Sequence, residues 1–272
     1  EDTVVEMDGS FRIFGARVRE DGAFLLAGAA GDNPGIAAYS AAGELLWAVE
    51  RDGRGGYGFY RDAVWLDGDT VVAVCAPGDL ELRAFALEYL ENGEIVRRAG
   101  SIVDPRGLYP LPDGFLISSA PEFYTARVEK RSPEGEVLWQ IDWDEWLSFN
   151  GIVTKGDVHV AFGKKTVRDG DIDHITSVAV AFDGRGAILW RIDGDDSYEF
   201  VDAVFTDAGN VVLAGEMFIA EYAAGGQVWR RDYPSQTVGY EGTSTGIWRM
   251  KSILPVDGGY LVCVDAGLIP GM

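Results

Sequence analysis

The sequence predicts an all-β fold, a six-bladed β-propeller with four-stranded blades, from three observations. A turn signature followed by an apolar run recurs six times along the 272 residues. A second signature, a glycine turn followed by tryptophan, recurs between copies of the first. The repeat is also circularly permuted, because its last unit lacks a strand that the N-terminal end of the chain supplies. Repeats of about 40–50 residues built from short strands are typical of propeller blades.

The first signature is a glycine, usually after an acidic residue, that precedes a run of β-forming residues. Its copies are DGAFLLAG, DGDTVVAV, DGFLISS, KGDVHVAFG, AGNVVLAG and DGGYLVCV, with their glycines at Gly22, Gly68, Gly114, Gly156, Gly209 and Gly258. Glycine permits the positive φ that a tight turn between two strands needs. The run after it is almost continuously apolar, which predicts a strand buried on both faces between blades.

The second signature is G-x-x-x-W. It occurs as Gly43…Trp47, Gly135…Trp139, Gly186…Trp190 and Gly225…Trp229, and a fifth copy keeps the turn at Gly93 but has Arg97 in place of tryptophan. A large ring at this offset can cover the seam between neighbouring blades. We therefore expect the four tryptophans to be structural and mostly buried at equivalent positions. The stretch ALEYLENGEIVRR contains an Asn-Gly turn signal, so we expect a hairpin there rather than a helix.

Each unit is expected to have strands a to d, with strand a before the first signature, strand b after it and the tryptophan on strand d. The sixth unit has strand a around 247–255, strand b at 260–264, and only 268–272 left for strand c. We expect Thr3–Met7 to supply its missing strand d. The N-terminal strand would thus complete the C-terminal blade and close the ring, which removes the open sheet edge. The whole chain, residues 1–272, is expected to be one propeller domain.

Charge and cysteine content narrow the function further. With 44 acidic and 23 basic residues the formal charge is −21, so a phosphate backbone would be repelled and we expect no nucleic-acid partner. No apolar run reaches the length of a transmembrane helix. Cys75 and Cys263 lie in similar apolar runs, and each is expected to be a small buried hydrophobe on a strand. We expect a monomer.

The G-x-x-x-W turn after a small apolar strand, as in AAYSAAGELLW and AVAFDGRGAILW, resembles the repeat of the pyrroloquinoline-quinone-type (quinoprotein-like) propellers. That superfamily includes quinoprotein dehydrogenases and a propeller lipoprotein that helps to assemble outer-membrane proteins. The DGGYLV element is similar to repeats in secreted bacterial propellers of unassigned function. The resemblance implies a bacterial-type secreted, cell-surface or periplasmic protein. Because this chain has no adjacent cysteine pair and six units, we expect no cofactor.

Few residues suggest metal or catalytic chemistry. His159 lies within DVHVAFG and is expected in the core, whereas His174 is expected to be exposed in a loop. These are the two histidines of the chain, and their spacing is not that of a zinc site. The loop Asp169-Gly170-Asp171-Ile172-Asp173 has alternate carboxylates, which makes Asp169, Asp171 and Asp173 a weak candidate calcium site. It lacks the later glutamate of a helix-loop-helix site, so a solvated acidic loop is favoured.

Loop length indicates the working face. The a–b and c–d turns are short, whereas the d–a connections and the b–c connection GKKTVRDGDIDHI are long, and both of these kinds share one face of a propeller. Aromatic residues on that face are the candidate ligand or partner contacts: Tyr57, Trp143, Trp146, Tyr198, Tyr233 and Tyr240. A recurring aromatic before strand a, such as Tyr198, is more typical of blade packing than of a site.

Three hypotheses for the function remain open. The first is a non-enzymatic binding module whose loop-rich face engages a glycan or a protein. The second is a carbohydrate-active enzyme with paired carboxylates at the mouth of the channel. The third, implied by the resemblance, is an assembly scaffold similar to the outer-membrane-protein assembly lipoprotein. Two carboxylates that face each other, at least one with a raised pKa, would favour the second hypothesis over the first.

Overall fold

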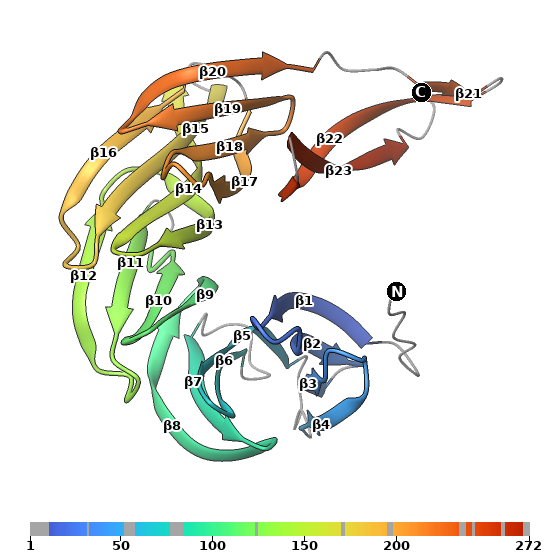
Figure 1. Ribbon diagram of the computed structural model, residues 1–272, viewed down its shortest axis with the longest axis vertical. Coiled ribbons are helices and arrows are strands. Elements are labelled where there is room, and N and C mark those ends of the chain that lie inside the picture. Colours follow the sequence, from blue (N-terminus) through green and yellow to red (C-terminus); the bar gives the residue numbers. More distant parts are fainter. Residues whose placement is uncertain are drawn as a thin grey trace. The chain divides into compact units, whose positions relative to one another are not determined.

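The structure is a computed structural model that describes residues 11–31, 33–51, 58–76, 84–122, 125–169, 172–194, 198–233, 238–240, 243–256 and 259–268. Within these ranges every regular element is a β-strand, and no helix suited to crossing a membrane is found. The strands form six antiparallel sheets, five of four strands and one of three (Figure 1). The chain divides into two compact units, residues 1–142 and 143–272.

The first unit contains three sheets, each with its strands in chain order. Sheet 1 consists of β1 (Phe11–Val18), β2 (Phe24–Ala30), β3 (Asn33–Tyr39) and β4 (Leu45–Glu50). Sheet 2 consists of β5 (Phe59–Asp67), β6 (Thr70–Ala76), β7 (Ala84–Glu91) and β8 (Glu94–Val103). Sheet 3 consists of β9 (Pro105–Leu111), β10 (Gly114–Ser119), β11 (Ala126–Arg131) and β12 (Val137–Trp143).

The second unit contains the other three sheets. Sheet 4 consists of β13 (Leu147–Lys155), β14 (Val158–Asp169), β15 (Ile172–Asp183) and β16 (Ile188–Asp193). Sheet 5 consists of β17 (Phe200–Phe205), β18 (Val211–Gly215), β19 (Phe218–Ala223) and β20 (Gly226–Asp232). Sheet 6 has the order β21 (Val238–Tyr240), β22 (Thr243–Val256) and β23 (Gly259–Leu268). The four-stranded sheets therefore show the predicted a-to-d order.

Both sequence signatures form the predicted turns. Positive φ angles occur at the turn glycines of the two signatures that the structure describes: Gly22, Gly43, Gly68, Gly93, Gly114, Gly135, Gly156, Gly186, Gly209 and Gly225. Only glycine adopts such angles without strain, so the repeated residue type follows from the repeated turn. Asn92 and Gly93, with φ of 49° and 83°, form the two-residue hairpin turn between β7 and β8. The hairpin prediction for ALEYLENGEIVRR is confirmed.

A β-bulge recurs in strand a of all six sheets, in the first half of the strand in sheets 1 to 5 and past the middle of β22 in sheet 6. The pairing register shifts by one residue between strands a and b of each sheet. The unpaired residues are Phe14, Arg61, Arg106, Asn150, Val201 and Lys251. A bulge bends its strand and turns one side chain away from the ladder. Each sheet thus has one residue on strand a that is displaced from the ladder, and in sheets 2, 3 and 5 it lies within three residues of the start of the strand.

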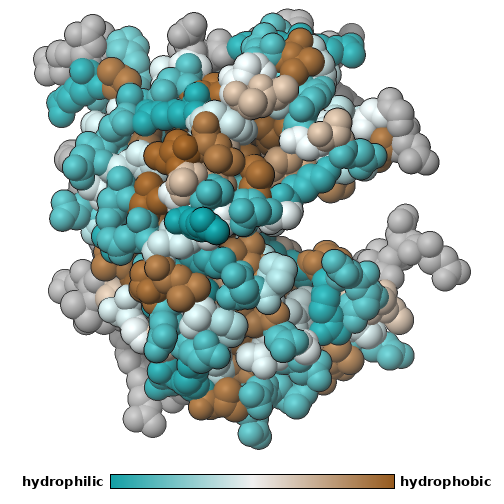
Figure 2. Space-filling model, turned by 60° about the vertical axis from the view of Figure 1, so that its left-hand side comes forward, coloured by the Kyte–Doolittle hydropathy of each residue, from teal (hydrophilic) through white to brown (hydrophobic). Residues whose placement is uncertain are grey.

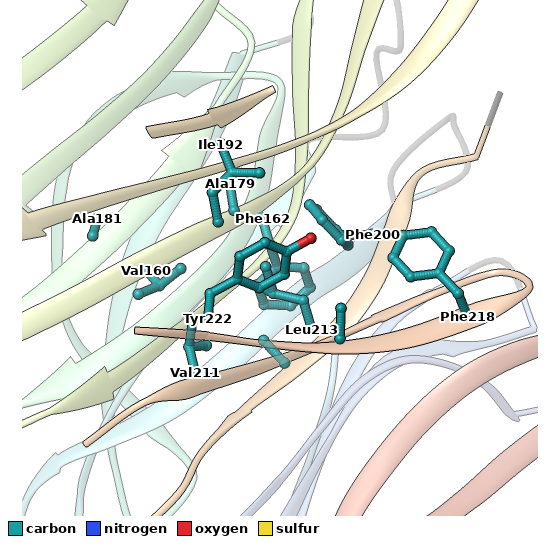
Figure 3. Close-up of a cluster of buried hydrophobic side chains, with 12 residues drawn as sticks. Val160, Phe162, Ala179, Ala181, Ile192, Phe200, Val211, Leu213, Phe218 and Tyr222 are labelled. Atoms are coloured by element: carbon teal, nitrogen blue, oxygen red, sulfur yellow. The ribbon is translucent and has the colours of Figure 1, made fainter. Parts of the chain in front are cut away.

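Within each unit the cores lie between neighbouring sheets. Figure 3 shows one of them, in which Val160 and Phe162 of β14 pack with Phe200, Val211 and Leu213 of sheet 5. The b strands β6, β10 and β18 are buried almost throughout, as their apolar sequences predict. Since both faces of these strands meet other side chains, their sequences do not alternate between apolar and polar residues.

The tryptophan position lies at the seam between sheets, as predicted. A Cβ placed on Gly93 of sheet 2 would lie 3.2 Å from Cε3 of Trp47 in sheet 1, and one on Gly225 of sheet 5 would lie 3.0 Å from Cβ of Trp190 in sheet 4. Arg97 takes the same place in sheet 2 and donates hydrogen bonds to the carbonyl oxygens of Pro133 and Glu134. The offset from the turn glycine therefore specifies a seam contact.

The burial part of the tryptophan prediction is confirmed as well, although none of the four rings is fully enclosed. Trp47, Trp139, Trp190 and Trp229 are each mostly buried, with a smaller part of the side chain in contact with solvent. Trp47, Trp190 and Trp229 pack against the core that joins their sheet to the following one. Trp229 also donates its indole N–H to Glu221, a polar contact that an enclosed apolar site would not offer.

Sheet 6 differs from the prediction in two ways. Leu268, assigned to strand c, is the last residue of β23, because strand b extends further than its apolar core suggests. Cys263 is exposed whereas Cys75 is buried as predicted, because β23 forms an edge of its sheet in the described part of the chain. The predicted closing strand, Thr3–Met7, lies outside the described residues, and the same holds for residues 269–272.

Candidate functional site

The b–c connection of sheet 4 is a β-hairpin arm, not the predicted loop. The segment GKKTVRDGDIDHI continues β14 and β15, which pair with each other as far as Asp169 and Ile172. The pairing of β14 with β13 ends at Lys165, and the pairing of β15 with β16 ends at Val178. Residues 166–169 and 172–176, here called the β14–β15 arm, therefore form a two-stranded ribbon beyond the sheet. The β-branched residues on both sides of Gly170, which include Thr166, Val167, Ile172 and Ile175, were the signal that favoured strands.

The base of the arm is fixed by the segment that precedes β13. Thr166 donates its backbone N–H to the carbonyl oxygen of Trp146 at 2.8 Å. Glu145, next to Trp146, accepts hydrogen bonds from both terminal nitrogens of Arg191, at 2.7 and 2.8 Å. It also forms an ion pair with Nζ of Lys165 at 2.6 Å. The hydrogen bonds from Arg191 and Lys165 lower the pKa of Glu145 to about 2. The arm therefore leaves the sheet from an ionic clamp of three side chains.

The two faces of the arm each carry one exposed apolar side chain. Val167 pairs with His174 on one face, and Ile175 pairs with Thr166 on the other. His174 is exposed as predicted, although it lies on a strand rather than in a loop. Arg168 and Asp173 approach to 4.0 Å across the ribbon. A ribbon with free edges and exposed apolar side chains is suited to contact with another surface.

The four aromatic candidates whose side chains are described do not form one cluster of exposed rings. Trp143 is only 7% exposed and packs edge-on against Phe149, with ring centroids 5.2 Å apart. Trp146 is half-buried at the base of the arm, and Tyr198 is 39% exposed before β17. Tyr233 is half-buried against the core between sheets 5 and 6. Tyr57 and the side chain of Tyr240 lie outside the described residues, and β21 forms within the predicted loop that contains Tyr240.

The weak calcium candidate is described only in part. The side chain of Asp173 is exposed near Arg168, whereas the side chains of Asp169 and Asp171 lie outside the described residues. Among the side chains that are described, no group of three or more potential ligands is placed to hold a metal ion. His159 lies in the core as predicted, where its ring packs against Phe182 at a centroid distance of 5.5 Å.

Two carboxyl groups on strand a have raised pKa values, and each joins adjacent sheets. Asp202 accepts the backbone N–H of Ile253 on β22 at 2.9 Å, and Asp62 accepts that of Leu108 on β9 at 2.9 Å. Burial raises the pKa of both groups, and the hydrogen bonds that they accept partly offset this effect. Asp62 also binds Arg17 at 2.5 Å. Each of these carboxylates fastens one inner strand to the next.

A third buried carboxylate was not foreseen from the sequence. Glu88 on β7 is 1% exposed and accepts hydrogen bonds from Arg51 at 2.5 Å, Tyr60 at 2.8 Å and Arg98 at 2.9 Å. Burial raises the pKa of Tyr60, and it raises the pKa of the adjacent thiol of Cys75 to about 12. The available signal was a single glutamate inside the apolar strand FALEYL. Its partners, far away in sequence, could not be identified.

The outer strands carry a second unforeseen feature. Exposed apolar residues follow the c–d turn in five sheets: Leu45, Leu46, Val96, Val137, Leu138, Ile188, Leu189 and Val228. Apolar patches interrupt the polar surface in Figure 2. The signal was the pair of apolar residues that directly precedes the tryptophan in GELLW, GEVLW and GAILW.

Solved structures with the same arrangement of sheets identify the fold. The WD40 domain of Neurospora crassa Pan2 aligns with a TM-score of 0.64 at 9% identity, over 93% of this chain and 72% of that one. KlAtg21, solved in complex with the coiled coil of AgAtg16, aligns with 0.64 at 9% identity, over 95% and 81%. A europium-containing methanol dehydrogenase aligns with 0.51 at 11% identity, over 93% and 68%. The chain has a β-propeller fold.

The structural likeness agrees with the resemblance to quinoprotein-like propellers that the repeat predicts. At identities of 9–11% it concerns the fold alone. No protein-family model matches the sequence, and no curated protein matches it either. The function therefore has to be argued from the side chains of this chain.

Proposed function

We propose that this propeller is a non-enzymatic binding module that engages a protein partner through the β14–β15 arm. The observation that carries the proposal is a ribbon that extends beyond its sheet from a fixed base. Propellers commonly act as interaction platforms through loops on one face. The arm lies at the end of sheet 4 where the d–a and b–c connections are found, which is the end that the sequence favours.

The construction of the arm suits protein recognition. An isolated two-stranded ribbon is marginally stable in water. Here the base is held by Glu145, Lys165 and Arg191, so the partner would not have to meet the full cost of ordering the arm. Exposed Val167 and Ile175 can be buried in a contact, and the unpaired backbone groups of the ribbon can accept a further strand.

A protein partner is favoured over a glycan by the state of the aromatic residues. Sugar recognition by stacking needs an open ring face, but of the described candidates Trp143 is buried, Trp146 and Tyr233 are half-buried, and only Tyr198 is exposed. KlAtg21, a propeller of similar fold, occurs in complex with a coiled coil, which supports a protein partner by analogy. The enzyme alternative would require two facing carboxylates, whereas Asp62 and Asp202 each bind a backbone N–H of the next inner strand.

Quantitative affinity purification with purified variants as bait tests the proposal. We expect the double substitution Val167→Asp with Ile175→Asp to abolish the enrichment of a partner that the unchanged protein captures. The control is Val96→Asp, at a more exposed apolar residue on β8, which should retain the partner. The melting temperatures of all three proteins should agree. Unchanged capture by the arm variant, or binding to a glycan array that the arm variant retains, would refute the proposal.

A further inference from the structure

Two adjacent inner strands place arginine at the same bulged position. Arg61 is the unpaired residue of the β5 bulge, and Arg106 is the unpaired residue of the β9 bulge. The corresponding residues in the other four sheets are Phe14, Asn150, Val201 and Lys251. Only sheets 2 and 3 thus present guanidinium groups there. Bulges of this kind often re-aim side chains at binding sites.

A hydrogen bond between the two strands sets the two arginines close together. Asp62 Oδ2 accepts the backbone N–H of Leu108 at 2.9 Å, which joins β5 to β9. Arg61 directly precedes Asp62, and Arg106 precedes Leu108 by two residues. Both arginines therefore lie on the same side of that hydrogen bond, at the beginning of their strands. Burial lowers the pKa of Arg61 and the positive charge of Arg106 lowers it further, whereas the charges of Asp104 and Asp62 partly oppose this effect; the influence of Arg106 agrees with its proximity.

The neighbouring carboxylates are already engaged. Asp62 binds Arg17 at 2.5 Å and accepts the backbone N–H groups of Ala63 and Leu108. Asp104 binds Arg106 at 2.8 Å. Arg61 is half-buried. It forms no hydrogen bond, and no ion pair within 4.0 Å, with any residue in the described part of the chain. Among the described residues, one unmatched positive charge is therefore left at the site.

An unmatched, partly buried guanidinium is costly, because it loses water without gaining a partner. It is more notable in a chain with a formal charge of −21, where acidic partners are abundant. The planar fork of arginine fits two oxygens of one oxyanion. Since Asp104 neutralises Arg106, the site has a net charge that matches a single negative charge.

We infer that Arg61 and Arg106 form a binding site for a small organic carboxylate at the bulged ends of β5 and β9. Arg61 supplies the bidentate hydrogen bonds, and Arg106, oriented by Asp104, supplies a further donor. This site is independent of the partner contact proposed for the arm, because it uses residues of sheets 2 and 3 alone. The carboxylate belongs to a free acid of low molecular weight.

Titration of the full chain with sodium acetate and sodium succinate, followed by the NMR signals of the arginine Nε–H groups, tests the site. We expect the Arg61 signal to shift with saturation, and Arg61→Gln to weaken binding at least tenfold because a charge-assisted bidentate contact is lost. Arg61→Lys, which keeps the charge but not the fork, should bind with intermediate affinity. Arg12→Gln, an exposed arginine on β1, is the matched control and should bind like the unchanged chain.

Stability provides a second readout that a structural role would not give. In buffer without carboxylates, Arg61→Gln should melt at the same temperature as the unchanged chain or higher, since it removes an unmatched charge. Acetate should raise the melting temperature of the unchanged chain and leave that of Arg61→Gln unmoved, with sodium chloride at equal ionic strength as the control. Equal binding by Arg61→Gln overturns the site. Tighter binding of inorganic phosphate than of acetate overturns its assignment to a carboxylate.

Discussion

At the scale of single residues, Glu88 joins three segments that are distant in sequence. Arg51 comes from the end of sheet 1, and Tyr60 and Arg98 come from the first and last strands of sheet 2. A buried carboxylate with three donors stabilises the seam only while the set is complete, because a missing charge leaves the arginines uncompensated. This set is a device for holding sheets 1 and 2 in register.

We predict that Glu88→Gln lowers the free energy of unfolding by about 2–4 kcal/mol, since it breaks a buried ion pair whose arginine partners still reach water. Urea denaturation measures the change. Glu94→Gln, at an exposed position on β8, is the matched control and should stay within about 0.5 kcal/mol. A Glu88 variant as stable as the control would show that the set contributes nothing.

The seam position of Trp190 leads to a second prediction at this scale. Trp190→Ala should cost about 2–3 kcal/mol, less than the loss of a fully buried ring, because one side of the indole already meets solvent. Leu189→Ala, at the exposed neighbour in the same strand, should change stability by less than about 0.5 kcal/mol. Thermal unfolding of both variants compares them directly. An equal loss of stability in the two variants would show that Trp190 does not stabilise the seam.

Single residues also show what could be predicted from the sequence. The turn glycines were identifiable because a positive φ is a local requirement, met by the same residue type in every copy. The partners of Glu88 were not, because nothing local connects position 88 with position 51. The seam location of Trp47 followed from its fixed offset. The part of the Trp47 side chain that remains in contact with solvent could not be predicted, because it depends on which edge of the sheet faces water.

At the scale of elements, the β14–β15 arm was predicted as a loop. The acidic run with Gly170 indicates a turn. The loop prediction was wrong because it also included the flanking segments, whose β-branched residues favour strands. Pairing between Arg168 and Asp173 was not predictable, because no core face fixes its register. Trp146 was selected for its departure from the repeat. It holds the arm through its backbone carbonyl, a contact that residue type does not reveal.

The clamp at the base of the arm should depend on pH. The pKa of Glu145 is lowered from 4.5 to about 2 in the folded protein, so the carboxylate stabilises the clamp above pH 4.5 and loses this contribution as the pH falls to about 2. We expect the amide NMR signal of Thr166 to move toward its disordered position over that interval. In Glu145→Gln the signal should already be displaced at pH 7 and change less with pH. A Thr166 signal that stays constant down to pH 2 would contradict the clamp.

At the scale of the whole molecule, the repeat predicted the fold because each sheet carries its own local turn signatures in the sequence. It predicted the last sheet less well, because no local signal marks where strand b ends. Leu261 on β23 is 60% exposed, whereas Leu25, Val72 and Val212 at the corresponding position of strand b are each 0% exposed. These three face the strand a of a following sheet. The apolar sequence of β23 therefore suits a face that another part of the chain covers.

The closing strand remains a prediction, and its test uses the two cysteines. We expect Thr3–Met7 to complete the sheet of β22 and β23, so deletion of residues 1–7 should lower the free energy of unfolding by several kcal/mol, on the order of the packing of one strand. The deletion should also speed the reaction of Cys263 with a thiol reagent, because the sheet would lose an outer strand that shields β23. Cys75 is buried and its pKa is raised to about 12, so it stays unreactive in the native state and the signal reports on Cys263 alone. Substitution of Glu1 and Asp2 by serine, which keeps the strand, is the control. A truncated chain with unchanged melting and unchanged thiol reactivity would mean that the N-terminal residues do not complete the last sheet.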